Sequence, residues 1–302
     1  MIDRNDVYVP ATCLPEQREH YISRFLAATK HTGNLMLFAG DQKIEHLNED
    51  FSGQEVHSDD NDPEHLFRIS SLADVGVFAA QHGMISRYAQ SYPDIRYLVK
   101  MNSKTHLVPT QQAEPVSRSL VDFSDVLDLR DSGVDVVGIG YTIYLGSEHE
   151  SFMLSEAGRL IAQAHRHGLL AVLWIYPRGK AVSNETDPSL IAGAAGVACS
   201  LGADFVKVSA PSIDEDKDAH LLEPAIKAAG RTGVIASGGG AISPEEFLRR
   251  TADQIRVGAR GSATGRNIHQ HELSVAVKIA KALTALMSGG SYDEAVQIFN
   301  SP

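Results

Sequence analysis

Short apolar runs alternate with amphipathic helical patterns along almost the whole of this 302-residue chain. Most of the runs are apolar throughout, which is typical of parallel strands that are covered on both faces. Eight runs predict strands, at residues 35–39, 75–80, 95–101, 134–139, 169–175, 205–209, 233–236 and 255–259, the last running on toward 263.

Capping signals mark the ends of the helical patterns. Asp187-Pro188 and Ser243-Pro244 place a capping residue before a helix-compatible proline, and glycines follow several helices where a left-handed cap is needed. The patterns predict helices at residues 16–29, 63–72, 85–91, 119–131, 151–167, 188–201, 221–229, 244–251, 272–287 and 292–299.

This alternation predicts a single α/β domain over residues 1–302, a (β/α)₈ TIM barrel. A helical extension over 1–33 precedes the barrel, and C-terminal helices over 270–302 follow it. A doubly wound open sheet is the alternative, but it usually has fewer strands and a Gly-rich first turn, which residues 40–43 do not form. The acidic segment 48–64 predicts an exposed insertion.

Charge and cysteine content exclude several classes of protein. The formal net charge of −11 argues against nucleic-acid and acidic-membrane partners, which need a field of Lys and Arg. No run approaches 18 apolar residues, and the N-terminus lacks an apolar signal core. The two cysteines form no C-x-x-C pair, so we expect a cytoplasmic protein without a disulfide framework.

Functional residues of a TIM barrel gather where its strands end. Lys207 lies inside an otherwise apolar strand, where burial favours the neutral amine that attacks a ketone. The alternative is a structural lysine at a strand end, paired with Asp41 or Glu45. Lys100 has a similar setting: two lysines in one barrel mouth would each lower the other's pKa, and Lys100 can also form a salt bridge with Asp41, because the two interpretations are compatible.

Two Gly-rich strand ends predict a phosphate site. Residues 237–240 and 265–267 follow the seventh and eighth strands, where barrels often bind phosphate through backbone N–H groups. Arg266 can add a charge-assisted contact. The alternative is that these glycines only turn the chain.

Other polar residues have more than one interpretation. Tyr176, at the end of the fifth strand, can transfer protons if a cation lowers its pKa, or it packs at the rim. Trp174, the only tryptophan, can be a core or lid residue. The 13 histidines show no three ligands on converging strand ends, so we predict neither a metal site nor a cofactor, and expect His165 and His167 on the surface.

Four short motifs over residues 35–270 resemble the archaeal-type class I fructose-bisphosphate aldolases, within the wider deoxyribose-phosphate-aldolase-like group. They are residues 174–179, 206–208, 237–239 and 265–268. The resemblance implies Lys207 as the Schiff-base lysine, Tyr176 as the general acid/base, Asp41 as a helper in proton transfer and Lys100 as a source of charge. It implies substrate and phosphate binding by Trp174, Ser237, Gly238, Gly239, Gly265 and Arg266.

One departure from the family pattern follows the first strand. The family has Asp-His-Gly and then Glu-His-Gly, whereas here Asp41 is followed by Gln42 and Lys43, and Glu45 by His46 and Leu47. Lys43 either adds charge near the substrate or points to solvent.

The resemblance implies reversible cleavage of fructose 1,6-bisphosphate, a reaction of glycolysis and gluconeogenesis, in a homo-oligomer. Two alternatives stay open. One is a related Schiff-base aldolase, transaldolase-like synthase or thiolase acting on another ketose phosphate. The other is a non-catalytic barrel that binds sugar phosphates.

Overall fold

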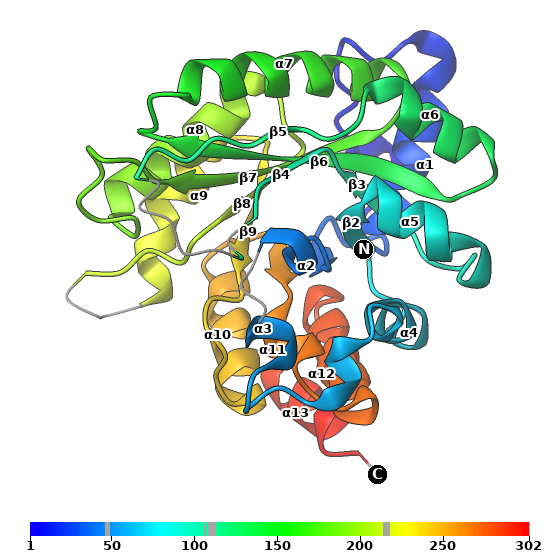
Figure 1. Cartoon of the computed structure of the whole chain (residues 1–302), viewed down its shortest axis with the longest axis vertical. Helices are drawn as coiled ribbons and strands as arrows, with labels where there is room; N and C mark the ends of the chain where they lie inside the picture. Colours follow the sequence, from blue (N-terminus) through cyan, green and yellow to red (C-terminus); the bar gives the residue numbers. More distant parts are fainter. Residues whose placement is uncertain (46–48, 106, 108–112, 214–217, 302) are drawn as a thin grey trace.

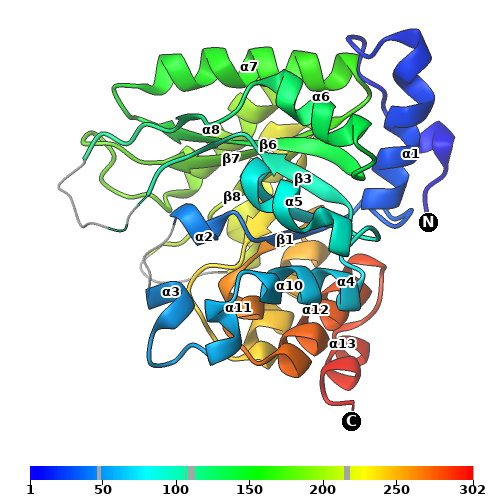
Figure 2. The same ribbon diagram turned by 45° about the vertical axis from the view of Figure 1, so that its right-hand side comes forward.

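Eight parallel strands close into a barrel in the order β1-β10-β9-β8-β7-β6-β3-β2 (Figure 1, Figure 2). This computed structural model describes residues 1–45, 49–105, 107, 113–213 and 218–301. The barrel strands are β1 (Leu35–Ala39), β2 (Val77–Gln81), β3 (Tyr97–Lys100), β6 (Val136–Leu145), β7 (Leu170–Pro177), β8 (Phe205–Val208), β9 (Gly233–Ser237) and β10 (Gly261–Thr264). The predicted TIM barrel is confirmed.

A ring of helices surrounds the barrel. The helices are α1 (Arg18–Ala28), α2 (Gln42–Glu45), α3 (Glu49–Ser52), α4 (Glu64–Ala73), α5 (His82–Tyr88), α6 (Phe123–Asp131), α7 (Glu150–Arg166), α8 (Pro188–Leu201), α9 (Glu223–Ala229), α10 (Pro244–Arg256), α11 (Arg266–His269), α12 (Leu273–Met287) and α13 (Tyr292–Phe299). Helix α12 packs against both α4 and α10, so it completes the ring, and α13 packs on α12. Beyond the barrel, β4 (Asn102–Ser103) and β5 (Arg118–Ser119) form a small antiparallel pair.

The predicted position of the eighth strand was wrong. Ile255 and Arg256 complete the last turn of α10, and β10 begins only at Gly261. Gly261 pairs with Leu35 of β1, and a Cβ atom there would lie 2.0 Å from the carbonyl oxygen of Leu35. The strand that closes the barrel therefore begins at a glycine, and its glycine, serine and threonine gave a weaker apolar signal than the helix before it.

Side chains of the barrel strands alternate between the interior and the surrounding helices. Leu98 of β3 and Phe205 of β8 belong to the interior apolar cluster, whereas Val99 and Val206 belong to the cluster under the helices. The residues two positions further along each strand, Lys100 and Lys207, therefore point into the barrel mouth.

The N-terminal segment closes the other end of the barrel. The ring of Phe25 on α1 stacks on that of Phe205, with centroids 5.8 Å apart. The hydroxyl of Tyr21 donates a hydrogen bond to Asp204, and Nε2 of His165 lies 3.1 Å from the same carboxylate. The expectation that His165 lies on the surface was wrong, because it is buried in this junction.

The segment after α2 is exposed over much of its length, as predicted, but it is anchored by two buried side chains. We call residues 49–62, which contain α3 and the 3₁₀ turn Ser58–Asn61, the strap. Phe51 and Asp60 of the strap are buried, at 3% and 1% exposure, so the prediction was wrong for them. The strap lies beside α11, which follows the last barrel strand (Figure 2).

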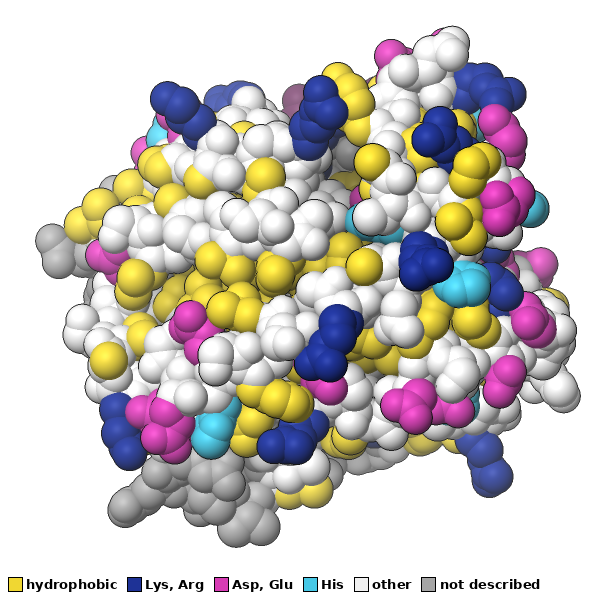
Figure 3. Space-filling view, turned by 90° about the horizontal axis from the view of Figure 1, so that it is seen from above, with side chains coloured by type: hydrophobic (Ala, Val, Ile, Leu, Met, Phe, Trp, Pro, Cys, Tyr) yellow, Lys and Arg dark blue, Asp and Glu magenta, His cyan; other side chains and the backbone are white. Residues whose placement is uncertain are grey.

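The side of the molecule that carries α7 has mixed character. Lys and Arg side chains lie apart from one another there, with Asp and Glu between them, and hydrophobic side chains gather in a central band (Figure 3). This face therefore offers no continuous positive field for a polyanion. Among the described residues, no helix is long and apolar enough to cross a membrane.

Candidate active site

Lys207 lies almost fully buried at the mouth of the barrel, with 3% of its surface exposed. Within the described parts of the chain, no hydrogen bond or ion pair reaches its amine. The Trp174 ring lies 5.5 Å away. Burial lowers the pKa of Lys207, and the charges of Lys100 and Arg266 lower it further against the opposing effect of Asp41 and Glu45. The structural alternative, a lysine paired with a carboxylate, does not describe Lys207.

Lys100, and not Lys207, forms ion pairs with the carboxylates of Glu45 and Asp41. Its amine lies 2.8 Å from Oε1 of Glu45 and 3.4 Å from Oδ2 of Asp41, and the lysine is fully buried. Burial alone would lower the pKa of Lys100, but Glu45 and Asp41 together raise it. The expectation that both lysines would have lowered pKa values is wrong for Lys100, because it has two anionic neighbours.

Trp174 forms the surface between the two lysines. Its ring lies 5.2 Å from the amine of Lys100 as well as 5.5 Å from that of Lys207. Gly140 on β6 makes room for the indole, since a Cβ there would lie 2.6 Å from it. Trp174 is therefore a packed wall of the mouth rather than a mobile lid.

Tyr176 ends β7 beside Tyr144 of β6, its partner in the strand register. Burial raises the pKa of Tyr176 well above its usual value, and the charges of Glu45 and Asp41 raise it further. Arg178 opposes this shift only weakly, because Glu185 binds its guanidinium through two contacts of 2.8 and 2.6 Å. Tyr176 thus remains a neutral phenol, which is a proton donor, and the nearby cation Arg178 does not bring its pKa below the usual value.

The glycine-rich loop after β9 presents backbone N–H groups. Gly239 has φ +68, and its amide and that of Gly240 donate no hydrogen bond to any described residue. Two side chains hold the carbonyls of this loop. Nδ2 of Asn267 donates to Gly238 at 3.0 Å and to Gly240 at 3.1 Å, and Arg250 also donates to Gly238. The loop can therefore bind an anion through its amides.

Arg266 approaches the same loop from α11. Its Nη2 donates to the carbonyl of Gly239 at 3.2 Å, and its Nη1 lies 3.4 Å from Oδ1 of Asp50. Gly265 caps α11, and Ser237 ends β9 next to Gly238. The structure thus brings together every residue that the sequence predicted for phosphate binding.

Sequence reasoning named Glu45 only as a possible partner of Lys207, placed Asn267 in a Gly-rich strand end without a role of its own, and did not single out Arg250. Glu45 lies four residues after Asp41, a spacing that places two carboxylates on the same side of one helical turn. Arg250 reaches the loop from α10, and no sequence signal separated it from a surface arginine. Within the described residues, no group of three or more His, Cys, Asp or Glu side chains is placed to hold a metal ion.

Comparison with known proteins agrees with this geometry. Residues 35–271 match the DeoC/LacD family aldolases. The chain belongs to this family. It is 53% identical to the fructose-bisphosphate aldolase/6-deoxy-5-ketofructose 1-phosphate synthase of Methanocaldococcus jannaschii, over 99% of this chain and 96% of that protein.

Solved structures of aldolases superpose on this DeoC/LacD family member. A fructose-bisphosphate aldolase from Slackia heliotrinireducens has a TM-score of 0.96 and 55% identity, covering 99% of this chain and 95% of its own. An archaeal fructose-1,6-bisphosphate aldolase has a TM-score of 0.75 and 32% identity, covering 88% and 98%. That structure has its catalytic lysine covalently bound to the carbinolamine intermediate of the substrate. The resemblance seen in the sequence is thereby confirmed at the level of the family.

Proposed function

We propose that this DeoC/LacD family member is a class I aldolase that cleaves fructose 1,6-bisphosphate through a Schiff base on Lys207. The proposal rests on one observation: two buried lysines have different partners. Lys100 binds both carboxylates, so Lys207 has no ion-pair partner among the described residues. Burial lowers the pKa of Lys207, which favours the neutral amine that acts as the nucleophile. A sugar-phosphate sensor would have no use for such a lysine.

The reaction begins at the C2 ketone of the substrate. The amine of Lys207 attacks this carbon, the carbonyl oxygen takes up protons and leaves as water, and an iminium forms. Loss of the C4 hydroxyl proton then breaks the C3–C4 bond. The bonding electrons move toward the iminium nitrogen, which gives an enamine and releases glyceraldehyde 3-phosphate. Protonation at C3 and addition of water release dihydroxyacetone phosphate and the free amine.

Tyr176 and the carboxylates divide the proton transfers. The neutral phenol of Tyr176 donates to the departing oxygen and to C3, because its raised pKa keeps it protonated. Asp41 and Glu45 are the bases that accept protons. Lys100 holds their charges at the mouth, and Trp174 keeps the substrate beside Lys207.

The phosphate next to the ketone binds at the glycine-rich loop. Free amides at Gly239 and Gly240, together with Arg266, offer donors from β9 and β10. Arg266 is among the charges that lower the pKa of Lys207, which supports a phosphate site near the nucleophile. Binding there orients the ketone toward the amine. Ser237, Gly238 and Gly265 shape the loop.

A second function differs only in the aldehyde. The Methanocaldococcus jannaschii relative is also named a 6-deoxy-5-ketofructose 1-phosphate synthase. Such a product forms when the enamine of dihydroxyacetone phosphate attacks an uncharged three-carbon ketoaldehyde. The tight pairing of Arg178 with Glu185 at the rim favours this reaction, because that cation is already neutralised. Rates of condensation with glyceraldehyde 3-phosphate and with methylglyoxal separate the two functions.

Borohydride trapping tests the Schiff base. Wild-type protein mixed with dihydroxyacetone phosphate and reduced should carry a stable adduct on the peptide that contains Lys207, identified by mass spectrometry. Lys207→Met should abolish the adduct and the cleavage activity, whereas Lys227→Met, at an exposed position on α9, should retain both. An adduct on Lys100, or full activity of Lys207→Met, would refute the proposal.

Assembly and location remain predictions. We expect a homo-oligomer in the cytoplasm, and light scattering coupled to size-exclusion chromatography checks the first of these. A single mass of one chain would contradict it.

A further inference from the structure

Lys43 is one of the residues at which this chain departs from the family pattern, and the structure shows what it binds. Its amine donates a hydrogen bond to the carbonyl of Asp60 at 2.9 Å and lies 4.1 Å from the centre of the Phe51 ring. Both partners belong to the strap. Lys43 therefore neither points freely to solvent nor lies among the catalytic groups, which answers the question that the sequence left open.

The strap residue Phe51 lies between two side chains from opposite ends of the chain. On one face is the Lys43 amine; on the other is the ring of His269, whose centroid is 4.7 Å away and whose plane is tilted by only 2°. Nδ1 of His269 in turn lies 2.6 Å from Oδ2 of Asp60, and both of these side chains are fully buried. A buried hydrogen bond of this kind is costly to break, so it fixes the strap against α11.

The strap also contacts Arg266, the residue that the proposed function assigns to phosphate binding. Oδ1 of Asp50 lies 3.4 Å from Nη1 of Arg266, and the carbonyl of Asp50 accepts a hydrogen bond of 2.8 Å from Gln270. Asp50 is the residue before Phe51. Clamping the Phe51 ring therefore also fixes the position of the carboxylate that contacts Arg266.

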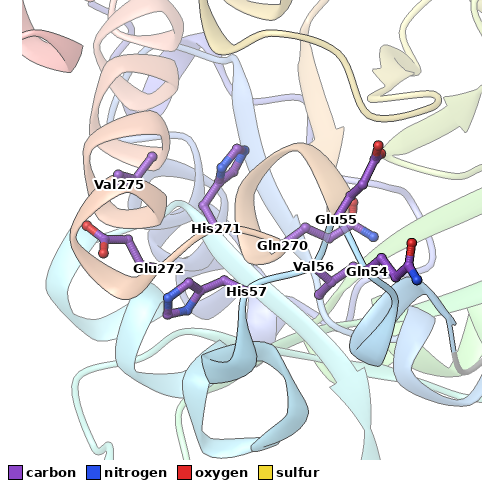
Figure 4. A pocket seen from close by; sticks show the side chains of 8 residues that line it. All are labelled: Gln54, Glu55, Val56, His57, Gln270, His271, Glu272 and Val275. Atoms are coloured by element: carbon purple, nitrogen blue, oxygen red, sulfur yellow. The ribbon is translucent and has the colours of Figure 1, made fainter.

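Farther along, the strap is less tightly packed. Its residues 54–57 face residues 270–275 across an open pocket of about 430 Å³ (Figure 4). The contacts with Lys43 and His269 hold the strap at Phe51 and Asp60, on either side of this pocket.

We propose that Lys43 is a positioning residue for phosphate binding: it clamps Phe51 and Asp60 of the strap, so that Asp50 orients Arg266 toward the substrate's phosphate. The inference rests on the proposed function, because it assumes that Arg266 binds the phosphate beside the ketone. The turn that carries Asp41 and Glu45 is thereby joined to Arg266, which follows the neighbouring strand β10. The loss of Lys43 should therefore weaken the binding of a phosphorylated ketone and leave the binding of an unphosphorylated ketone unchanged.

Two ketones distinguish positioning from a general structural role. Schiff-base trapping is measured against concentration for dihydroxyacetone phosphate and for dihydroxyacetone, which lacks the phosphate. In Lys43→Met the concentration of dihydroxyacetone phosphate that gives half-maximal trapping should rise about tenfold, the size expected for one lost hydrogen bond to a charged group. The value for dihydroxyacetone should stay within about twofold of wild type, and Lys43→Arg should restore most of the loss.

Lys30→Met is the matched control. Lys30 also makes an ion pair, with Asp74 at 2.6 Å, before the first strand and far from the mouth, so its loss should change neither value. Equal weakening of both ketones in Lys43→Met, or no rescue by Lys43→Arg, would overturn the positioning role. Wild-type protein that traps neither ketone would instead refute the proposed function.

Discussion

Lys100 and Lys207 show how neighbours decide the chemistry of identical side chains. Each lies on the interior face near the end of a barrel strand, and the amine of each lies within 5.5 Å of the centre of the Trp174 ring. Two carboxylates raise the pKa of Lys100, whereas burial and the cationic Lys100 lower that of Lys207. The first lysine therefore supplies charge, and the second supplies the nucleophile.

Removing the charge of Lys100 should move the pH dependence of trapping. In Lys100→Met the cation that lowers the pKa of Lys207 is gone, and Asp41 and Glu45 then raise that pKa. Only the neutral amine reacts, so the acidic limb of the trapping rate should shift to higher pH. Borohydride-dependent inactivation by dihydroxyacetone phosphate, followed between pH 5 and 10, measures the shift. A limb that stays in place, or moves to lower pH, would contradict this electrostatic account.

Gly140 is required by the indole of Trp174. A Cβ at this position would lie 2.6 Å from Trp174 and 2.7 Å from Leu98, both of them buried. We expect Gly140→Ala to lower the free energy of unfolding by about 1–3 kcal/mol through overpacking, measured by urea denaturation. Gly193→Ala on α8 is the control: a Cβ there meets nothing within 4 Å, so stability should be unchanged or slightly higher.

The sequence predicts site residues that lie at the ends of strands, but it does not predict those that reach the site from distant parts of the chain. Lys207 and Lys100 interrupt apolar runs, so the period-two pattern places them in the mouth. Nothing local indicates that Arg250 on α10 reaches the glycine-rich loop. The roles assigned to Tyr176, Trp174 and the phosphate-binding residues remain predictions until they are tested by mutation.

At the scale of elements, the apolar signal was reliable where large apolar residues fill a strand and failed at β10, which has none. β7 and β8 were placed to within two residues, because Leu, Ile, Val and Phe fill them. β10 has only glycine, serine, alanine and threonine. The strand was therefore predicted to begin at the more apolar C-terminal end of α10. The strap was misjudged for a related reason: its acidic composition hid Phe51 and Asp60, which are buried by α11 and not by local sequence.

The strap should make stability depend on pH. Burial raises the pKa of Asp60 to about 7, so the folded state favours its protonated form. This contribution is complete below the ordinary pKa of an aspartate, about 4, and is lost as pH rises through about 7. Asp60→Asn removes the titration while keeping a group that accepts from His269. The fall in melting temperature of wild type between pH 5 and pH 8 should therefore be smaller in Asp60→Asn; an equal fall would show that Asp60 is not the source.

At the scale of the whole molecule, two apolar clusters together extend from the N-terminal segment to α13. One cluster joins α1 to the barrel interior, and the other joins the barrel strands to the surrounding helices. We therefore expect the single-domain prediction to hold as one cooperative unfolding unit.

Two probes that report on different places can check this. Fluorescence of Trp174, the only tryptophan, reports on the mouth, and far-ultraviolet circular dichroism reports on all helices. Their transitions in guanidinium chloride should coincide. Phe25→Ala, which removes the ring stacked on Phe205 at the opposite end, should shift both midpoints together. An early loss of helix signal with unchanged fluorescence would make the N-terminal segment a separate unit.

The pairing of β1 with β10 also matters while the chain is being synthesised. β1 is the first barrel strand made, and its second neighbour ends only at Thr264. Until that residue leaves the ribosome, one edge of the nascent sheet has no partner and can pair with other chains. The barrel therefore becomes safe from such misassembly only once Thr264 has left the ribosome, which makes the synthesis of the segment between β1 and β10 the period in which a chaperone would matter most.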